Sequence, residues 1–244
     1  MFHVVIPARH ASTRLPGKPL LMLAGKPMLQ WVHESARRSR AASVVVATDD
    51  ERIATAARGF GADVQMTAAT HASGTDRIAE VARARGWDAE QVVVNLQGDE
   101  PLMPHALVDQ VASLLLAHRG DDMATLAGPL ADAAAFADAN VVKLVADRDG
   151  RAMYFSRAPI PCDRDAGSAP AAARRHIGLY AYRVRGLQKL ASLPPSPLEQ
   201  LEKLEQLRAL ENGLAIRVAD AVVAPGQDVN TAADLERAAE QLRA

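Results

Sequence analysis

Residues 92–101 read Val92-Val93-Val94-Asn95-Leu96-Gln97-Gly98-Asp99-Glu100-Pro101, a short β-branched run that passes directly into polar residues. Similar apolar runs occur at residues 4–6 and 44–46, and helix-like patterns occupy residues 28–36, 53–57 and 78–84 between the runs. Strands that alternate with helices predict crossover connections and a mostly parallel sheet. Because the runs are apolar at every position, we expect helices on both faces of that sheet, which makes the fold doubly wound.

Polar residues follow two of these predicted strands at the point where each strand ends. Pro7-Ala8-Arg9 follows the first strand, and Gln97-Gly98-Asp99 follows the strand at residues 92–94. Ligands of open α/β sheets bind in the crevice outside the carboxyl ends of the strands. The sequence therefore predicts a ligand site at this edge.

Composition and charge limit the possible classes of protein. The chain has 244 residues, 49% hydrophobic and 23% charged, which excludes collagen-like, low-complexity and wholly disordered chains, and we expect a single domain over residues 1–244. A net charge of -1 gives no overall attraction to nucleic acid or to a membrane, so neither is expected as a partner. The single cysteine, Cys162, cannot form an intrachain disulfide and is assigned no chemistry. The apolar start of the chain is too short for a signal peptide, so a cytoplasmic protein is expected.

The second half of the chain has a different pattern. Residues 141–145, 153–155 and 177–182 resemble strands around a polar stretch at 164–174, which predicts an antiparallel insertion of about residues 141–190 with a mobile loop. Leucines at every third position from 198 to 210 predict one helix after the prolines at 194–197. A strand near residues 215–218 and a helix capped by Thr231 complete the predicted fold.

A cationic loop follows the first strand. The segment from residue 7 to 20 carries Arg9, Arg14 and Lys18 but lacks the glycines of a dinucleotide fingerprint and the spacing of a Walker loop. Backbone N–H groups and cationic side chains in such a loop can neutralise and orient a triphosphate. A solvated basic loop is the alternative, and the position directly after a buried strand favours the phosphate site.

Short motifs occur in the order of one enzyme family at residues 7–20, 47–50, 71–77, 95–101, 154–161, 175–183, 195–199 and 204–208. Together they resemble the sugar-acid cytidylyltransferases, and most of all the 3-deoxy-manno-octulosonate (Kdo) cytidylyltransferase family. The resemblance implies a Rossmann-like nucleotidyltransferase fold whose insertion binds the sugar and joins a homodimer. It also implies cytidylyl transfer from CTP to Kdo, giving CMP-Kdo and pyrophosphate for lipopolysaccharide biosynthesis, with Mg²⁺ as cofactor.

The resemblance assigns the nucleotide to two loops. It implies that Lys18, Arg9 and Asp99 are catalytic. It places base recognition at residues 73–77, where an ordinary N-capped helix start is a compatible alternative. The implied nucleotide-binding residues are Ala8, Arg9, Ser12, Arg14, Gly17, Lys18, Ser73, Gly74, Thr75 and Arg77.

The implied metal site departs from the family pattern at one position. Asp99 follows a buried strand, and a hard carboxylate oxygen there suits Mg²⁺, although a turn-forming Asp beside Gly is common. For the second ligand, Asn230 stands where the family usually carries an aspartate, and Asp228 lies two residues earlier. Asn230 stands at the position of the family's aspartate, whereas Asp228 has the carboxylate group that the family uses. Both remain candidates for the second ligand.

The sugar acid requires a cation for its carboxylate and polar groups for its hydroxyls, and Arg175 is one candidate cation. The resemblance implies that the substrate-binding residues are Gln97, Arg157, His176, Tyr180, Glu202, Glu205 and Gln206. A structural role for His176 and a solvated helix face for the glutamates are the alternatives.

Two other functions remain open from the sequence. A cytidylyltransferase for 8-amino-Kdo or a sialic acid would differ at only a few side chains. A nucleotide-binding module without catalysis would fit a weakened metal site, but the presence of Arg9, Arg14, Lys18 and Asp99 argues against it.

Overall fold

A mixed β-sheet forms the centre of the molecule. The computed structural model describes residues 1–10, 15–165 and 172–243. In these ranges the strands of the main sheet are β1 (Phe2–Ala8), β4 (Ser43–Thr48), β5 (Asp63–Met66), β6 (Val92–Asn95), β7 (Met123–Pro129), β8 (Lys143–Ala146), β9 (Ala152–Ser156), β10 (Arg174–Arg183) and β11 (Ile216–Asp220). Two further strands, β2 (Met22–Leu23) and β3 (Lys26–Pro27), pair only with each other.

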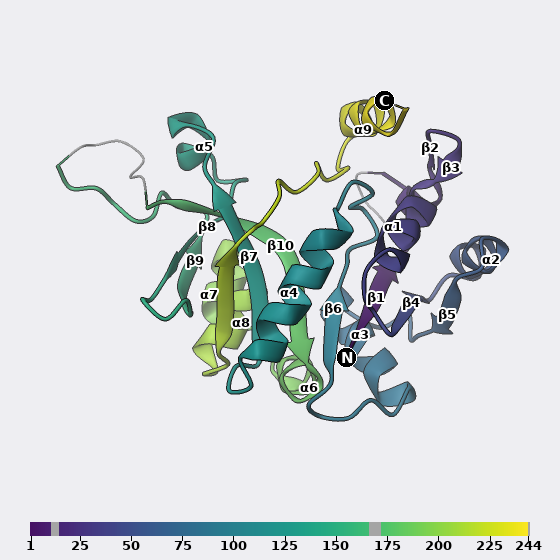
Figure 1. The fold of residues 1–244 in the computed structure, drawn as a ribbon, viewed down its shortest axis with the longest axis horizontal. Coiled ribbons are helices and arrows are strands. Elements are labelled where there is room, and N and C mark those ends of the chain that lie inside the picture. Colours follow the sequence, from purple (N-terminus) through teal and green to yellow (C-terminus); the bar gives the residue numbers. More distant parts are fainter. Residues whose placement is uncertain (11–14, 166–171, 244) are drawn as a thin grey trace.

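The strand order explains where a ligand can enter. The sheet runs β11-β7-β10-β6-β1-β4-β5, with β8 and β9 attached beside β10 (Figure 1). Strand β1 is parallel to both β4 and β6, whereas β10 is antiparallel to β6 and β7. The carboxyl ends of β1 and β6 therefore lie side by side at one edge, as predicted from the sequence.

Helices cover both faces of the sheet, and the predicted doubly wound α/β fold is confirmed. The helices are α1 (Met28–Arg37), α2 (Glu51–Gly59), α3 (Gly74–Ala84), α4 (His105–Ala117), α5 (Ala133–Ala137), α6 (Val184–Ser192), α7 (Pro197–Glu202), α8 (Gln206–Glu211) and α9 (Ala232–Arg243). Val4 and Ile6 of β1 pack in the core that contains α1, α2 and α4, while Val5 packs in the core that contains α3, α6 and α8. Among the described residues, no helix has the length and apolar character needed to cross a membrane.

The antiparallel insertion is confirmed as well. Strand β8 pairs with β9 and with the first residues of β10, both in antiparallel register. Residues 166–171, within the loop for which mobility was predicted, lie outside the described residues, as do Ser12 and Arg14 in the cationic loop.

The prediction of one helix from residue 198 to 210 is wrong. Lys203 adopts a left-handed backbone conformation with a φ of 54°, and its N–H bonds to the carbonyl of Glu199, which ends α7. The chain then starts a separate helix, α8, at Gln206. Leu204 and Leu207 are buried, whereas Leu201 is 79% exposed. The leucine spacing therefore does not form one continuous buried stripe.

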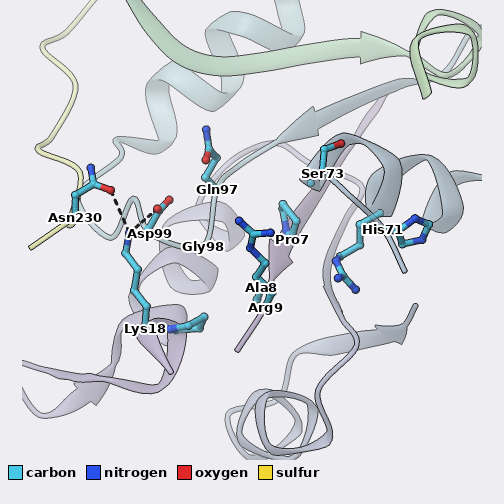
Figure 2. Close-up of a pocket in the computed structure, with 13 residues that line it drawn as sticks. Pro7, Ala8, Arg9, Lys18, His71, Ser73, Gln97, Gly98, Asp99 and Asn230 are labelled. Carbon is cyan, nitrogen blue, oxygen red and sulfur yellow. Dashed lines mark hydrogen bonds and ion pairs between the residues drawn. The ribbon is translucent and has the colours of Figure 1, made fainter. Parts of the chain in front are cut away.

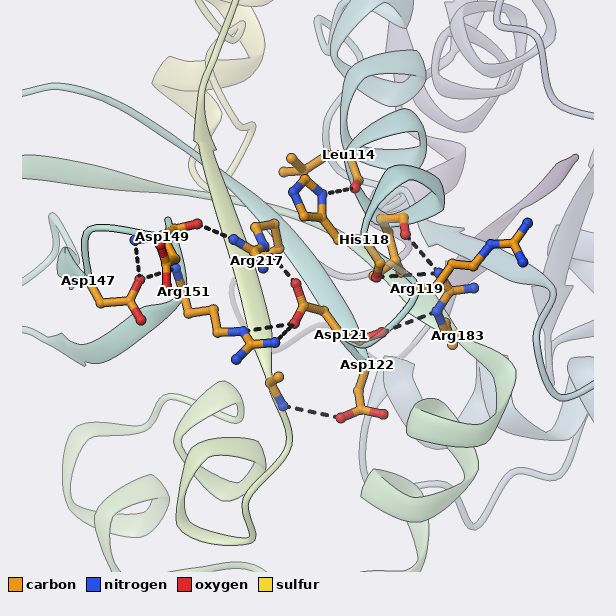
Figure 3. A network of polar contacts seen from close by, with 12 residues as sticks. Leu114, His118, Arg119, Asp121, Asp122, Asp147, Asp149, Arg151, Arg183 and Arg217 are labelled. Atoms are coloured by element: carbon orange, nitrogen blue, oxygen red, sulfur yellow. Dashed lines mark hydrogen bonds and ion pairs between the residues drawn. The ribbon is translucent and has the colours of Figure 1, made fainter.

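A buried ion network ties the insertion to the sheet at the end opposite the predicted site (Figure 3). Asp121, just before β7, accepts a 2.6 Å hydrogen bond from Nε of Arg217 on β11 and a 2.9 Å hydrogen bond from Nε of Arg151 beside β9. Arg183 at the end of β10 donates to the Asp121 carbonyl at 3.1 Å. The buried Asp121 carboxylate thus pairs with Arg151 and Arg217, and its backbone carbonyl binds Arg183, so one residue links β11, β10 and the start of β9.

Candidate active site

A cleft of about 380 Å³ opens at the carboxyl ends of β1 and β6. Its lining combines cationic, hydroxyl and amide groups with exposed backbone, which suits a phosphate-bearing ligand. The residues that line it are Pro7, Ala8, Arg9, Lys18, Pro19, His71, Ser73, Gly74, Arg77, Gln97, Gly98, Asp99 and Asn230 (Figure 2).

Three polar side chains from distant parts of the sequence meet in this cleft. Nζ of Lys18 lies 2.6 Å from Oδ2 of Asp99 and 3.4 Å from Oδ1 of Asn230, and Figure 2 shows the lysine reaching between the two. The backbone N–H of Val229 donates to the Asp99 carbonyl at 3.1 Å, which holds the Asn230 segment against the loop after β6. The two oxygens therefore converge on one positive charge.

Glycines allow the loop that carries Lys18 and the loop that carries Asp99 to lie within hydrogen-bonding distance of each other. Gly17 precedes Lys18 with a φ of +66°, a conformation that other residues rarely adopt. A Cβ on Gly98 would lie 3.1 Å from the carbonyl oxygen of Pro7, so a larger residue would push the Asp99 loop away from β1. Gly17 itself is not among the described residues that line the cleft.

The N-terminus of α3 forms the wall opposite Lys18. Oγ of Ser73 accepts a hydrogen bond from the N–H of Asp76 at 3.1 Å, and the Asp76 carboxylate accepts one from the N–H of Ser73 at the same distance. This capping box holds Ser73 and Gly74 at the cleft. The two interpretations of the segment, a helix cap and a ligand-facing loop, are therefore compatible.

Two residues of this wall have partners inside the protein. Arg77 lines the cleft, but its guanidinium pairs with Asp49 at 3.3 Å and hydrogen-bonds to Thr67. Thr75 is not among the described residues that line the cleft, and its hydroxyl donates to Glu205 instead. The Thr75 hydroxyl thus points away from the cleft, although the resemblance places Thr75 among the nucleotide-binding residues.

A second cavity of about 180 Å³ adjoins the cleft, and Gln97 lines both. Oδ1 of Asn95 and Nε2 of Gln206 are buried there without a hydrogen-bond partner among the described residues. Buried polar atoms normally have partners, so unsatisfied ones in a cavity indicate a polar ligand. The cavity is lined by Asn95, Gln97, Met123, His176, Gly178, Tyr180, Tyr182, Leu190, Leu204, Glu205 and Gln206.

His176 is held as a neutral ring in this cavity. Its Nε2 lies 3.2 Å from the Thr125 hydroxyl, and its ring packs edge-on against Phe155 at 5.1 Å. Burial, with a smaller contribution from the charge of Arg175, lowers the pKa of His176 to about 3. At neutral pH the ring can donate or accept a hydrogen bond but carries no charge.

Arg157 and Glu202 are not among the described residues that line this cavity. Nε of Arg157 donates to the Glu202 carbonyl at 2.6 Å, and the Glu202 carboxylate accepts from Oγ of Ser156 at 2.6 Å. Glu199 pairs with Arg208 at 2.6 Å. The carboxylates of Glu199, Glu202 and Glu205 therefore each have a partner inside the protein, which differs from the alternative of a solvated glutamate face.

Asp228 lies in a third cavity, of about 200 Å³, with Glu100 and Arg175. Desolvation and the nearby charge of Asp99 raise the pKa of Asp228. Burial raises the pKa of Glu100 well above its usual range, and Asp228 and Asp99 add to the effect. Asn230, not Asp228, is the residue that shares the cleft with Asp99.

The sequence alone indicates no role for several residues of these cavities. His71, Gly98 and Asn95 lie within motifs of the family resemblance, at residues 71–77 and 95–101, but the resemblance implies no role for any of the three. The detectable signal for Asn95 is an amide at the end of an otherwise apolar run, in a strand whose other residues are buried.

Comparisons with known proteins identify relatives of this chain. The cytidylyltransferase family profile matches residues 3–216. The 3-deoxy-manno-octulosonate cytidylyltransferase of Pseudomonas fluorescens is 54% identical over 250 residues, with 100% of this chain and 98% of the relative covered. The enzyme of the same name from Thioalkalivibrio sulfidiphilus is also 54% identical, over 248 residues, with 100% and 99% covered.

Solved structures show the same likeness. The structure of CMP:2-keto-3-deoxy-manno-octonic acid synthetase complexed with CTP matches with a TM-score of 0.92 and 42% identity, covering 100% of this chain and 99% of that one. A cytidylyltransferase from Leptospira borgpetersenii matches with a TM-score of 0.64 and 20% identity over 96% of this chain and 83% of that one, and shares the fold.

Proposed function

This chain belongs to the cytidylyltransferase family, and we propose that it transfers the cytidylyl group of CTP to Kdo, giving CMP-Kdo and pyrophosphate. The observation that carries the proposal is the junction of two cavities at Gln97. The first cavity has the cationic groups that a triphosphate requires and a carboxylate that can hold a metal cation, and the second has unpaired amide atoms that can hydrogen-bond to sugar hydroxyls. A reacting hydroxyl and an α-phosphate can therefore meet at their boundary.

The residues of the cleft align and neutralise the reactants. The anomeric hydroxyl of Kdo releases its proton to solvent and forms a bond to the α-phosphorus of CTP, and the bond from that phosphorus to the bridging oxygen breaks. Pyrophosphate leaves with the bonding electrons. Lys18 and Arg9 stabilise the negative charge that spreads over the phosphate oxygens. Ser73 and Gly74 hold the nucleoside end at the start of α3.

We propose Mg²⁺ as the cofactor, held by Asp99 and Asn230. Oδ2 of Asp99 lies 2.6 Å and Oδ1 of Asn230 lies 3.4 Å from Nζ of Lys18. These two oxygens therefore favour a positive charge at this position. A carboxylate and an amide carbonyl are hard oxygen ligands suited to Mg²⁺. The ion would neutralise phosphate charge when bound. Among the described residues no group of three or more His, Cys, Asp or Glu side chains could hold a metal, so the nucleotide would complete the coordination.

We further propose a cytoplasmic homodimer whose product feeds lipopolysaccharide biosynthesis. Met153 on β9 is 65% exposed and Leu201 on α7 is 79% exposed, and both belong to the region around the insertion. A homodimer joined through the insertion would remove these two apolar side chains from water. Sedimentation equilibrium, with Met153→Glu and Leu201→Glu as the test variants, would measure the mass of the assembly. The dimer proposal predicts twice the monomer mass for the wild type and a monomer for the variants.

The experiment that tests the function uses purified protein with CTP, Mg²⁺ and one sugar acid at a time. The acids are Kdo, 8-amino-Kdo and N-acetylneuraminate, and pyrophosphate release is followed. We expect release with Kdo that is lost in Asp99→Ala. Faster release with 8-amino-Kdo or N-acetylneuraminate would reassign the substrate, and CTP binding without release would indicate a binding module.

A further inference from the structure

One hydrogen bond connects the wall of the nucleotide cleft with the wall of the second cavity. Oγ1 of Thr75 donates to Oε2 of Glu205, and the two residues are 130 positions apart in the sequence. Thr75 is 2% exposed and follows Gly74, which lines the cleft. Glu205 lines the second cavity. The bond therefore spans the two subsites.

Few groups hold the Glu205 carboxylate in place. Its other oxygen, Oε1, lies 3.4 Å from Nη2 of Arg208, and that arginine makes shorter bonds to Glu199 at 2.8 and 2.6 Å. Glu205 stands immediately before α8 and two residues after the left-handed Lys203. A side chain at such a break has little support from regular helix packing, so the Thr75 hydroxyl is its closest anchor.

The surroundings of Glu205 place its charge inside the cavity. Burial raises the pKa of the Tyr182 hydroxyl, and the negative charge of Glu205 raises it further. Tyr182 lines the same cavity as Glu205 and Asn95. Gln206, with its unpartnered Nε2, follows Glu205 directly. Glu205 and Gln206 thus present an acceptor and a donor side by side to a polyhydroxyl ligand.

We propose that Thr75 is a positioning residue for the sugar acid, whose hydroxyl orients Glu205 so that the carboxylate accepts hydrogen bonds from sugar hydroxyl groups. This inference rests on the proposed function, because it takes the second cavity as the sugar site. It gives Thr75 a different role from the nucleotide contact that the sequence resemblance implies. Loss of the hydroxyl should weaken sugar binding and leave CTP binding intact.

The test compares the wild type with Thr75→Val, which removes the hydroxyl at nearly constant volume, and Thr75→Ser, which keeps it. Pyrophosphate release gives KM for Kdo and for CTP separately. We expect Thr75→Val to raise KM for Kdo about tenfold, the size of effect for a hydrogen bond to a charged group, with KM for CTP within about twofold. Thr75→Ser should restore KM for Kdo to within about threefold of the wild type.

A Glu205→Ala variant adds a second test, because it removes the acceptor of the Thr75 hydrogen bond. If Thr75 acts through Glu205, adding Thr75→Val to Glu205→Ala should change KM for Kdo by less than about twofold. A rise in KM for CTP in Thr75→Val, an unchanged KM for Kdo, or a further tenfold effect in the double variant would overturn the inference. Failure of the proposed function is distinguishable, because the wild type itself would then release no pyrophosphate with Kdo.

Discussion

The ammonium of Lys18 lies 2.6 Å from Oδ2 of Asp99, although the two residues belong to loops after different strands, 81 positions apart. The lysine side chain is 11% exposed and the aspartate 32%, so the pair is partly shielded from water. Both groups face the cleft rather than the hydrophobic core. This arrangement places one fixed positive and one fixed negative charge where a triphosphate and a cation would bind.

Lys18→Met should lower kcat for pyrophosphate release by about 10²- to 10³-fold, the usual effect of removing one charge-stabilising group. The melting temperature should change by no more than a few degrees, because the pair is at the cleft and not in the core. Lys26→Met is a matched control, since Lys26 forms an exposed pair with Glu34 outside the cleft. Activity of Lys18→Met within tenfold of the wild type would argue against this role.

Asn230 and Asp228 can be distinguished by their effects on Mg²⁺ dependence. Asn230→Ala should raise the Mg²⁺ concentration for half-maximal activity about tenfold or more, because it removes an oxygen beside Asp99. Asp228→Ala should raise it less than about threefold, since Asp228 contributes only nearby charge. The Mg²⁺-dependent rise in melting temperature with bound CTP is an independent measurement. The opposite ranking of the two variants would identify Asp228 as the ligand.

Asp121→Ala should lower the free energy of unfolding by about 3 kcal/mol, because removal of one partner leaves the Arg217 and Arg151 guanidinium groups without their buried carboxylate. Urea denaturation measures this loss. Asp109→Ala breaks a pair with the largely exposed Arg40 and should cost less than about 1 kcal/mol. Specific activity at low temperature should stay near that of the wild type, since the network lies away from the cleft. Equal losses in both variants would contradict the account of this network.

His176 predicts a specific loss of stability in acid. Its pKa is about 3 in the folded chain, while an unfolded histidine has its ordinary value of 6.5, so below pH 6.5 the unfolded state takes up a proton that the folded state does not. The contribution of the neutral His176 ring to the free energy of unfolding is fully present above pH 6.5. Below that pH it decreases by up to about 1.4 kcal/mol per pH unit. The difference in unfolding free energy between wild type and His176→Gln should therefore shrink from pH 7.5 to pH 5.5. A pH-independent difference would mean that His176 titrates normally.

The sequence was sufficient for the sheet and for the position of the cleft. The apolar runs at residues 4–6, 44–46 and 92–94 became the buried strands β1, β4 and β6, because strands covered on both faces have no polar positions. The loops that carry Lys18 and Asp99 follow the neighbouring strands β1 and β6, so strand order brings both loops to the same edge of the sheet. Such local patterns, together with the family resemblance, were enough to identify the fold and the class of reaction.

The second cavity was harder to predict because its residues depend on tertiary contacts. Leucines at regular spacing predict one helix, but the left-handed conformation of Lys203 divides it and directs Glu205 toward Thr75. The Arg157 guanidinium donates to the backbone carbonyl of Glu202 and the Glu202 carboxylate accepts from Ser156, and neither Arg157 nor Glu202 is among the described residues that line the cavity. Spacing along the chain cannot show which polar side chain pairs with which neighbour, and that pairing determines the side chains that remain for a ligand.

The most direct measurement is phosphorus NMR of CTP, Mg²⁺ and Kdo incubated with the purified protein. The proposed reaction predicts that the three CTP resonances are replaced by one phosphodiester signal and one pyrophosphate signal, containing one and two phosphorus atoms per molecule of CTP. Omission of Kdo should leave CTP unchanged. Appearance of CDP with inorganic phosphate, or pyrophosphate without a phosphodiester, would contradict cytidylyl transfer to the sugar acid.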